Sequence, residues 1–169
     1  TEAWALAGGY GEVRRDALSF ALLAPNPHNR QPWLIELAEP GVVTLYADPA
    51  RMLPQTDPVN RQITVGLGGF LELMRMAAAE AGHRVDIATF PQGENPAALD
   101  GRPIARAVFT ADPGVTRDPL FAAVPDRRSL KEPYDTRRPV PAEAVAQAGA
   151  AVRTARFGAS TAPDDIAFW

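Results

Sequence analysis

Residues 24–33 read Ala-Pro-Asn-Pro-His-Asn-Arg-Gln-Pro-Trp, and this stretch joins the first helix expected in the chain to the first expected strand. Its prolines restrict the backbone torsions, and its asparagine and glutamine side chains offer directed hydrogen bonds. It contains no carboxylic acid, no thiol and no nucleophile suited to attack a substrate. A junction of this composition favours holding a flat polar ligand over reacting with one.

The segments around this junction predict an α+β fold. Apolar residues recur at helical spacing before the junction, and Pro25 ends that helix. After the junction, two short runs separated by Glu39-Pro40-Gly41 predict a β-hairpin. The whole pattern predicts helices over 11–23, 60–81, 119–124 and 141–154, and strands over 33–38, 42–47, 84–90 and 104–110. This order lacks the regular alternation that is typical of a doubly wound parallel sheet.

The helix expected over 60–81 is unusual because its first half carries Gly66, Gly68 and Gly69. Each glycine costs about 1 kcal/mol relative to alanine in a helix. We therefore expect the close approach of another backbone or of a planar ligand to offset that cost. Asn60 is the expected N-cap of this helix, and Gly82 is its expected C-terminal stop.

Composition limits the classes of function that the chain can serve. It has 169 residues, a net charge of −3 and no cysteine. The charge argues against a general nucleic-acid or anionic-membrane surface, and the lack of cysteine excludes disulfides and thiolate chemistry. No apolar run is long enough to span a bilayer. The two histidines, His28 and His83, have no carboxylate at metal-ligand spacing, so we expect no metal site.

The N-terminal region holds a weak resemblance to an export signal. Arg14 and Arg15 precede a short apolar run, but Asp16 interrupts it and no small-x-small cleavage site follows. An amphipathic helix is the better interpretation of this segment. We therefore expect a cytoplasmic protein with no membrane partner.

A second informative stretch spans residues 127–140. It holds five cations, namely Arg127, Arg128, Lys131, Arg137 and Arg138, together with the Ser129 hydroxyl. Guanidinium groups donate parallel hydrogen bonds that suit phosphate oxygens. On a chain of net negative charge, this cluster is either a local anion site or a solvated charged loop.

Both stretches resemble motifs of the nitroreductase-like flavoproteins. That superfamily has a Pro-Ser-x-x-Asn-x-Gln-Pro-Trp segment between a helix and a strand, and an Arg-Arg-Ser segment elsewhere. The positions that match the first motif are Pro25, Asn29, Gln31, Pro32 and Trp33, with Asn26 at the serine position. Arg127, Arg128 and Ser129 match the second motif, and Lys131 stands at the position where that motif has its next cationic residue.

The resemblance implies a fold, a cofactor and a set of binding residues. The fold is a three-layer α/β/α sandwich with a mostly antiparallel sheet and a long central helix. The cofactor is FMN, which carries the redox chemistry, so no catalytic side chain is identified. The implied FMN-binding residues are Pro25, Asn26, Asn29, Gln31, Arg127, Arg128, Ser129 and Lys131. Trp33 is expected in the core more than against the cofactor, because it begins a buried strand.

The order of the two motifs is unusual, because Arg-Arg-Ser ordinarily precedes the Gln-Pro-Trp segment within one subunit. Here it follows by about a hundred residues, which resembles the mycobacterial Acg-like branch, where two nitroreductase-like halves are fused. The implied domains are a first half over 1–120 and the start of a second half over 121–169. The site then lies between two halves or two subunits, as in a homodimer or fused pseudo-dimer. The chain is expected to lack the rest of the second half.

Three functions remain open at this point. The first is NAD(P)H-dependent reduction of nitroaromatic or quinone-like acceptors by an FMN enzyme. The second is FMN storage or sequestration without turnover, which uses the same residues. The third is a flavin-free interaction domain, in which the arginine-rich stretch is a charged surface.

Overall fold

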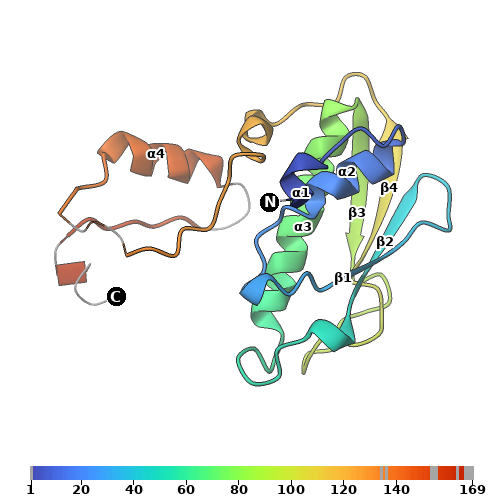
Figure 1. Cartoon of the computed structure of the whole chain (residues 1–169), viewed down its shortest axis with the longest axis horizontal. Helices are drawn as coiled ribbons and strands as arrows, with labels where there is room; N and C mark the ends of the chain where they lie inside the picture. The colour runs from blue at the N-terminus through green and yellow to red at the C-terminus, as the bar shows by residue number, and fades with distance from the viewer. Residues whose placement is uncertain (1, 134, 136, 153–155, 163, 166–169) are drawn as a thin grey trace. The chain divides into compact units, whose positions relative to one another are not determined.

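The computed structural model describes residues 2–133, 135, 137–152, 156–162 and 164–165. The chain divides into two compact units, Thr1–Ser129 and Leu130–Trp169. The first unit contains the sheet, the long helix, the 24–33 junction and the start of the arginine-rich stretch, residues 127–129 (Figure 1). Each unit is described by itself below.

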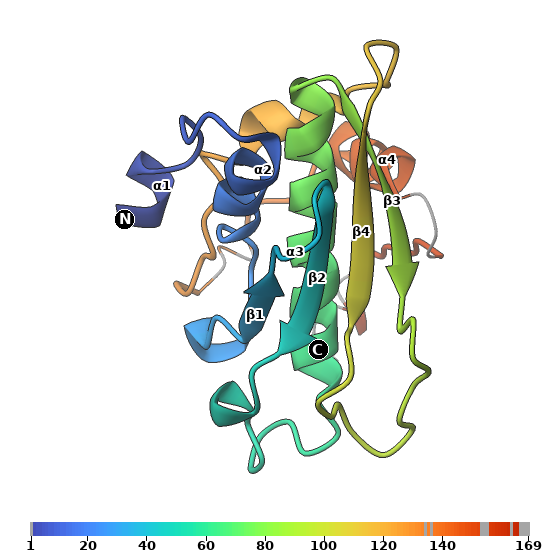
Figure 2. The same ribbon diagram turned by 90° about the vertical axis from the view of Figure 1, so that its right-hand side faces the viewer.

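A four-stranded antiparallel sheet forms the first unit's framework, in the order β1-β2-β4-β3. Its strands are β1 (Trp33–Glu36), β2 (Val42–Ala47), β3 (His83–Thr89) and β4 (Ala105–Ala111). Leu45 pairs with Ile35 on one side and with Ala105 on the other, which sets the register of the central strands. All four predicted strands are confirmed, with ends that differ by a residue or two, as Figure 2 shows from the sheet side.

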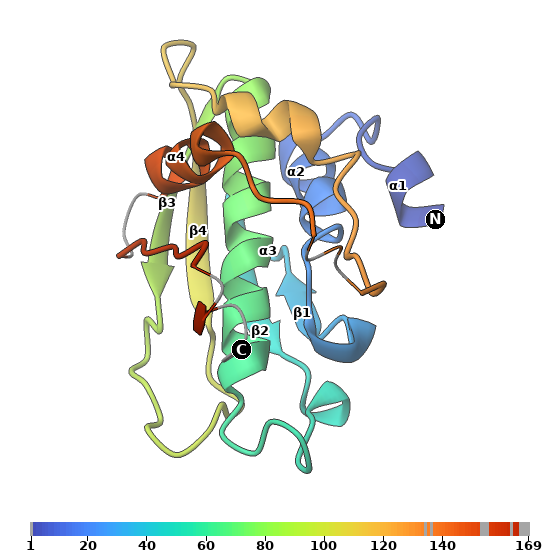
Figure 3. The same cartoon turned by 90° about the vertical axis from the view of Figure 1, so that its left-hand side faces the viewer.

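Helices α2 (Val13–Ala21) and α3 (Arg61–Glu80) pack against one face of this sheet (Figures 2 and 3). Three 3₁₀ turns complete the unit: η1 (Pro27–Asn29), η2 (Pro49–Arg51) and η3 (Pro119–Ala123). The α+β class, the antiparallel sheet and the long central helix are therefore confirmed. The first unit supplies the sheet and one helical layer. A further short helix, α1 (Glu2–Ala5), was not expected from the sequence.

The core lies between α3 and the sheet. Phe70, Leu67 and Met74 of α3 are almost fully buried, as is Leu45 on β2. Trp33 is also buried, and its ring centroid lies 4.8 Å from that of Phe70. Trp33 therefore belongs to the core, as the sequence predicted.

The two ends of α3 are stabilised differently from one another. Asn60 precedes the helix with φ +57°, and its side chain makes no cap bond. Its Oδ1 instead accepts a 3.0 Å bond from the Leu99 amide, while the Asp57 carboxylate accepts a 2.9 Å bond from the Ile63 amide. Asn60 therefore stands at the predicted N-cap position, but the buried Asp57 carboxylate and not the Asn60 side chain accepts the bond from the first turn of α3. Gly82 ends the helix at φ +69°, as predicted.

In the second unit, the described residues include helix α4 (Ala142–Ala151). The described residues of α4 are exposed or half-buried. Gly149 lies against the Phe157 ring. The helix was predicted to continue to 154, but residues 153 and 154 lie outside the described residues. The first compact unit extends to Ser129, whereas the predicted boundary between halves lies at 120, and that division stays a prediction.

None of the helices in the described part of the chain has the length and apolarity to span a bilayer.

Candidate functional site

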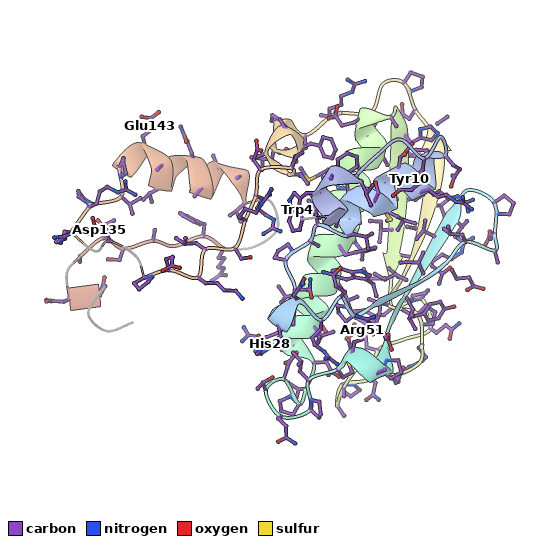
Figure 4. The ribbon with its side chains drawn as sticks, in the orientation of Figure 1. Trp4, Tyr10, His28, Arg51, Asp135 and Glu143 are labelled. Atoms are coloured by element: carbon purple, nitrogen blue, oxygen red, sulfur yellow. The ribbon has the colours of Figure 1, made fainter. Side chains whose placement is uncertain are left out.

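The loop between α2 and β1 has a strained backbone. His28, Asn29 and Gln31 adopt left-handed torsions, with φ values of 50°, 52° and 53°. Side chains with a Cβ rarely occupy this region, so three such residues within four positions must be held by surrounding contacts. Figure 4 labels His28 on this loop. Strain of this kind is common where a loop is shaped for a ligand.

Asn26 holds the loop closed from within. Its Oδ1 accepts a 2.8 Å bond from the backbone N–H of Gln31, and its Nδ2 donates a 3.2 Å bond to the carbonyl oxygen of Ala24. The backbone N–H of Asn29 also donates a 3.2 Å bond to the backbone carbonyl oxygen of Asn26. Asn26, which the sequence proposed as a cofactor contact, therefore uses both of its side-chain groups on the loop itself.

Asn29 and Gln31, which the sequence also proposed as cofactor contacts, have their side-chain amides at the surface. The Gln31 Nε2 donates a 2.8 Å bond to the Asn29 Oδ1, and this pair lies at the surface. Pro25, four residues before Asn29, is also exposed. The Asn29 Nδ2 and the Gln31 Oε1 can therefore serve a polar ligand without breaking the bond between the two residues.

A pair of arginines clamps this loop to the 3₁₀ turn η2. Arg30 donates to the carbonyls of Ala50 and Arg51, each at 3.0 Å, while Arg51 returns a 2.9 Å bond to the Arg30 carbonyl. Asp48 fixes Arg51 through a 3.1 Å ion pair. Sequence reasoning missed this clamp, because the arginines lie 21 residues apart and no local pattern links them.

Helix α3 passes directly behind the loop at Gly66. A Cβ on Gly66 would lie 3.3 Å from the Asn26 Cβ and 3.4 Å from the Pro25 carbonyl oxygen. The close backbone approach predicted from the glycines is therefore confirmed at Gly66. Gly69 has looser neighbours, at 3.9 Å, and Gly68 faces open space.

The arginine-rich segment reaches the same loop from the far end of the first unit. Arg127 donates a 2.6 Å bond from Nη2 to the carbonyl oxygen of Leu23, across 104 residues of sequence. The Arg127 Nε is buried and has no acceptor among the described residues. The start of the second motif is thus bonded to the residue that directly precedes the 24–33 stretch.

The other residues of the second motif differ in their surroundings. Arg128 stacks on the Trp4 ring, with its Cζ 4.7 Å from the ring centroid, and donates to the Pro125 carbonyl at 2.6 Å. Ser129 is exposed at the end of the first unit. Lys131 is exposed and belongs to the second unit.

The junction loop supplies side-chain amides and strained backbone, and Arg127 and Arg128 supply guanidinium groups at the start of the second motif. Such a set binds an anion and a polar planar edge but offers no nucleophile of its own. A small hollow of about 110 Å³ lies at the β-hairpin, lined by Glu36, Ala38, Glu39, Val42 and Thr44. None of the proposed cofactor residues lines that hollow.

Comparison with known proteins identifies relatives by sequence. Acg of Mycobacterium tuberculosis, whose name assigns it to the NAD(P)H nitroreductases, is 33% identical over 125 residues, which cover 73% of this chain and 38% of that protein. Rv3131 of the same organism carries a similar name and is 31% identical over 147 residues, which cover 87% of this chain and 40% of Rv3131. The chain thus spans about two-fifths of the length of these relatives. No family model matches the chain.

Among solved structures, a nitroreductase from Desulfovibrio desulfuricans in complex with FMN aligns with a TM-score of 0.44 and 16% identity. The alignment covers 76% of this chain and 88% of that one.

Proposed function

This chain belongs to the nitroreductase-like superfamily, and from that membership we propose that it contributes one half of an FMN-dependent oxidoreductase. The reaction we propose is the NAD(P)H-dependent reduction of a nitroaromatic or quinone-like acceptor. The observation that carries the proposal is the 2.6 Å bond from Arg127 to Leu23, because it ties the start of the arginine-rich stretch to the residue that leads into the 24–33 junction. We propose a cytoplasmic location for this enzyme.

The residues present fit the chemistry of FMN. Arg127 has a buried Nε–H without an acceptor among the described residues, which suits an anionic phosphate oxygen. Arg128 adds a second cation beside it, and Ser129 adds a hydroxyl. Asn29 and Gln31 supply amide donors and acceptors suited to the edge of a flavin ring.

The remaining proposed residues would act around these contacts. Pro25 and Asn26 shape the loop, Asn26 through its bonds to Gln31 and Ala24. Lys131 belongs to the second unit, and its contact with FMN stays a prediction from the motif. When bound, FMN would supply the transfer of electrons from NAD(P)H to the acceptor. The residues of this chain would then bind and orient FMN, which agrees with the lack of a nucleophile in the loop.

We also propose that a second nitroreductase-like half, or a second copy of the chain, completes the site. The outward face of α3 supports this. Val65 is 71% exposed there, and Gly68 on the same face has no neighbour within 4 Å of its would-be Cβ. A large apolar side chain beside an exposed helical glycine is unfavourable unless another surface covers both.

The test is the absorption spectrum of the purified full-length protein, with the released cofactor identified by chromatography. We expect a flavin spectrum that yields FMN, and about tenfold or greater loss of FMN affinity in Arg127→Ala. Arg137→Ala is the matched control, because Arg137 belongs to the same arginine-rich stretch but is 92% exposed and paired with Asp135. A colourless protein that does not take up added FMN would refute the proposal.

Turnover separates the enzyme from a storage protein. With FMN bound, we expect NADPH oxidation to depend on an added quinone or nitroaromatic acceptor. A protein that retains FMN but shows no acceptor-dependent oxidation would instead be a flavin store.

A further inference from the structure

The junction between α2 and β1 holds Gln31 in a conformation that its neighbour opposes. Gln31 has φ 53°, although it directly precedes Pro32. The residue before a proline ordinarily takes an extended conformation, because the proline ring crowds its backbone. A left-handed torsion at this position is therefore unfavourable for two reasons, and the contacts around Gln31 must hold it in place.

The peptide group between Arg30 and Gln31 is bonded at both of its polar atoms. Its carbonyl oxygen, on Arg30, accepts a 2.9 Å bond from the Arg51 Nη1. Its N–H, on Gln31, donates a 2.8 Å bond to the Asn26 Oδ1. The peptide group is planar, so these two bonds fix its orientation and thereby the torsion at Gln31. One bond comes from within the junction, and the other comes from the η2 turn.

The η2 turn is also bonded to the junction on both sides of Gln31. The Arg30 side chain, before Gln31, donates to two carbonyl oxygens of the turn, each at 3.0 Å. The carbonyl oxygen of Pro32, after Gln31, accepts a 2.9 Å bond from the backbone N–H of Asp48. Figure 4 labels Arg51 on this turn, and Figure 2 shows the turn beside the junction.

Asp48 orients the arginine that reaches the peptide group. Its Oδ2 lies 3.1 Å from the Arg51 Nε, and its Oδ1 accepts a 2.9 Å bond from the backbone N–H of Ala50. The Asp48 side chain is 18% exposed, whereas that of Arg51 is 51% exposed. A half-exposed arginine ordinarily samples several rotamers, so the better buried carboxylate restricts which way the guanidinium points. The planar guanidinium then spans the Asp48 carboxylate and the Arg30 carbonyl oxygen.

We propose that Arg51, with Arg30 and Asp48, is a positioning residue that keeps the junction ready for its ligand. This inference rests on the proposed function, in which that ligand is FMN. The arginines act through the backbone, by donating to carbonyl oxygens across the junction and the turn. The conformation they hold places the Gln31 side chain beside Asn29, with a 2.8 Å bond between the two amides. Without the clamp, the peptide group can rotate, and Gln31 can relax to the extended conformation that precedes a proline.

A junction that is correctly shaped in only part of the molecules binds its ligand more weakly by that fraction. We therefore expect Arg51→Ala to bind FMN roughly three- to thirty-fold more weakly than the parent protein, as for one charge-assisted hydrogen bond on a half-exposed side chain. Arg51→Lys keeps a cation beside Asp48 but loses the planar guanidinium, so it should recover part of the affinity.

Arg14→Ala is the matched control. The Arg14 side chain also donates to backbone carbonyl oxygens, among them those of Glu39 at 2.9 Å and Val42 at 3.0 Å, and it is paired with Glu12. These bonds tie α2 to the β-hairpin and not to the junction. Arg14→Ala should therefore lower the free energy of unfolding without changing the affinity for FMN.

The experiment compares the full-length parent protein with these variants in three measurements. Quenching of flavin fluorescence gives the affinity for FMN, urea unfolding gives the stability, and hydrogen exchange without FMN gives the protection of single amides. We expect Arg51→Ala to weaken FMN binding and to speed exchange of the Gln31 amide, while the Ile63 amide of α3 exchanges as in the parent. Parent-like FMN affinity in Arg51→Ala, an equal loss of affinity in Arg14→Ala, or unchanged exchange at Gln31 would overturn the proposal.

The two proposals fail separately. A parent protein that binds no FMN, but in which Arg51→Ala speeds exchange at Gln31, would refute the flavoprotein and support the clamp as the device that orders the junction. A parent protein that binds FMN, with the same affinity in Arg51→Ala, would refute the clamp and leave the flavoprotein standing.

Discussion

The Nη2 atom of Arg127 lies 2.6 Å from the carbonyl oxygen of Leu23, and this bond ties the start of the second motif to the residue just before the first. Leu23 is 1% exposed, so its carbonyl oxygen sits in an apolar cluster with little access to water. A charged donor is therefore well placed to satisfy it.

Truncating this arginine should affect the free energy of unfolding as well as ligand binding. We expect Arg127→Ala to destabilise the chain by about 1.5–3 kcal/mol, because the buried Leu23 carbonyl loses a charged donor. Urea unfolding followed by circular dichroism measures this loss. Arg137→Ala, on an exposed side chain, should change the unfolding free energy by less than about 0.5 kcal/mol. Equal effects of the two substitutions would contradict the role given to the Arg127 bond.

Two glycines of α3 should respond oppositely to the same substitution. Gly66→Ala should destabilise by about 1–3 kcal/mol, because its Cβ would press on the Asn26 and Pro25 backbone of a loop that cannot easily yield. Gly68→Ala should stabilise this chain by about 0.5–1 kcal/mol, since alanine favours the helix and open space surrounds the new methyl group. Thermal unfolding of both variants side by side tests the prediction, and a shared sign would refute it.

The N-terminal cap of α3 can be assigned by comparing two neighbouring polar residues. Asp57→Ala should lower the free energy of unfolding by about 1–2 kcal/mol, because the Ile63 amide loses the acceptor that caps the helix. Asn60→Ala removes the bond from the Leu99 amide instead, and so should loosen the loop that contains Leu99. Hydrogen exchange distinguishes the two: only Asp57→Ala should speed exchange of the Ile63 amide. Faster exchange of that amide in Asn60→Ala alone would show that the Asn60 side chain, and not Asp57, stabilises the first turn of α3.

The cap of α2 should make stability depend on pH. Burial raises the pKa of Glu12, but hydrogen bonds from the Arg14 backbone and side chain and from the Arg15 amide outweigh it, so its pKa is lowered below 4.5. A carboxylate with a lowered pKa stabilises the fold above its unfolded pKa, and that contribution is lost as pH falls through the folded value. Glu12→Gln should thus be less stable than the parent at pH 7.

The expected difference is about 0.5–1 kcal/mol, at the low end for a cap because the Glu12 side chain is 37% exposed. It should shrink as pH falls from about 5 and disappear once Glu12 is protonated in both states. Urea midpoints at pH 7, 5 and 3 measure this. A difference that stays constant over the range would show that the charge of Glu12 does not contribute to the cap.

Much of the fold could be predicted because it depends on neighbours in the chain. All four strands, the long helix and the stop at Gly82 lie where hydrophobic periodicity and glycine predicted them. The α1 helix was missed, since four residues carry no periodic signal. The residues of the candidate site were named from motif resemblance, and their roles stay predictions.

Sequence by itself therefore determined the order of helices and strands, the core position of Trp33 and the need for a close approach along α3, because torsional preference and periodicity are local properties of the chain. Only the tertiary structure decided that the Asp57 carboxylate and not the Asn60 side chain bonds the first turn of α3, that Gly66 is crowded while Gly68 is open, and that Arg127 reaches Leu23. Each of these depends on which distant residues meet, and that is set by the packing of the whole unit and not by any local pattern.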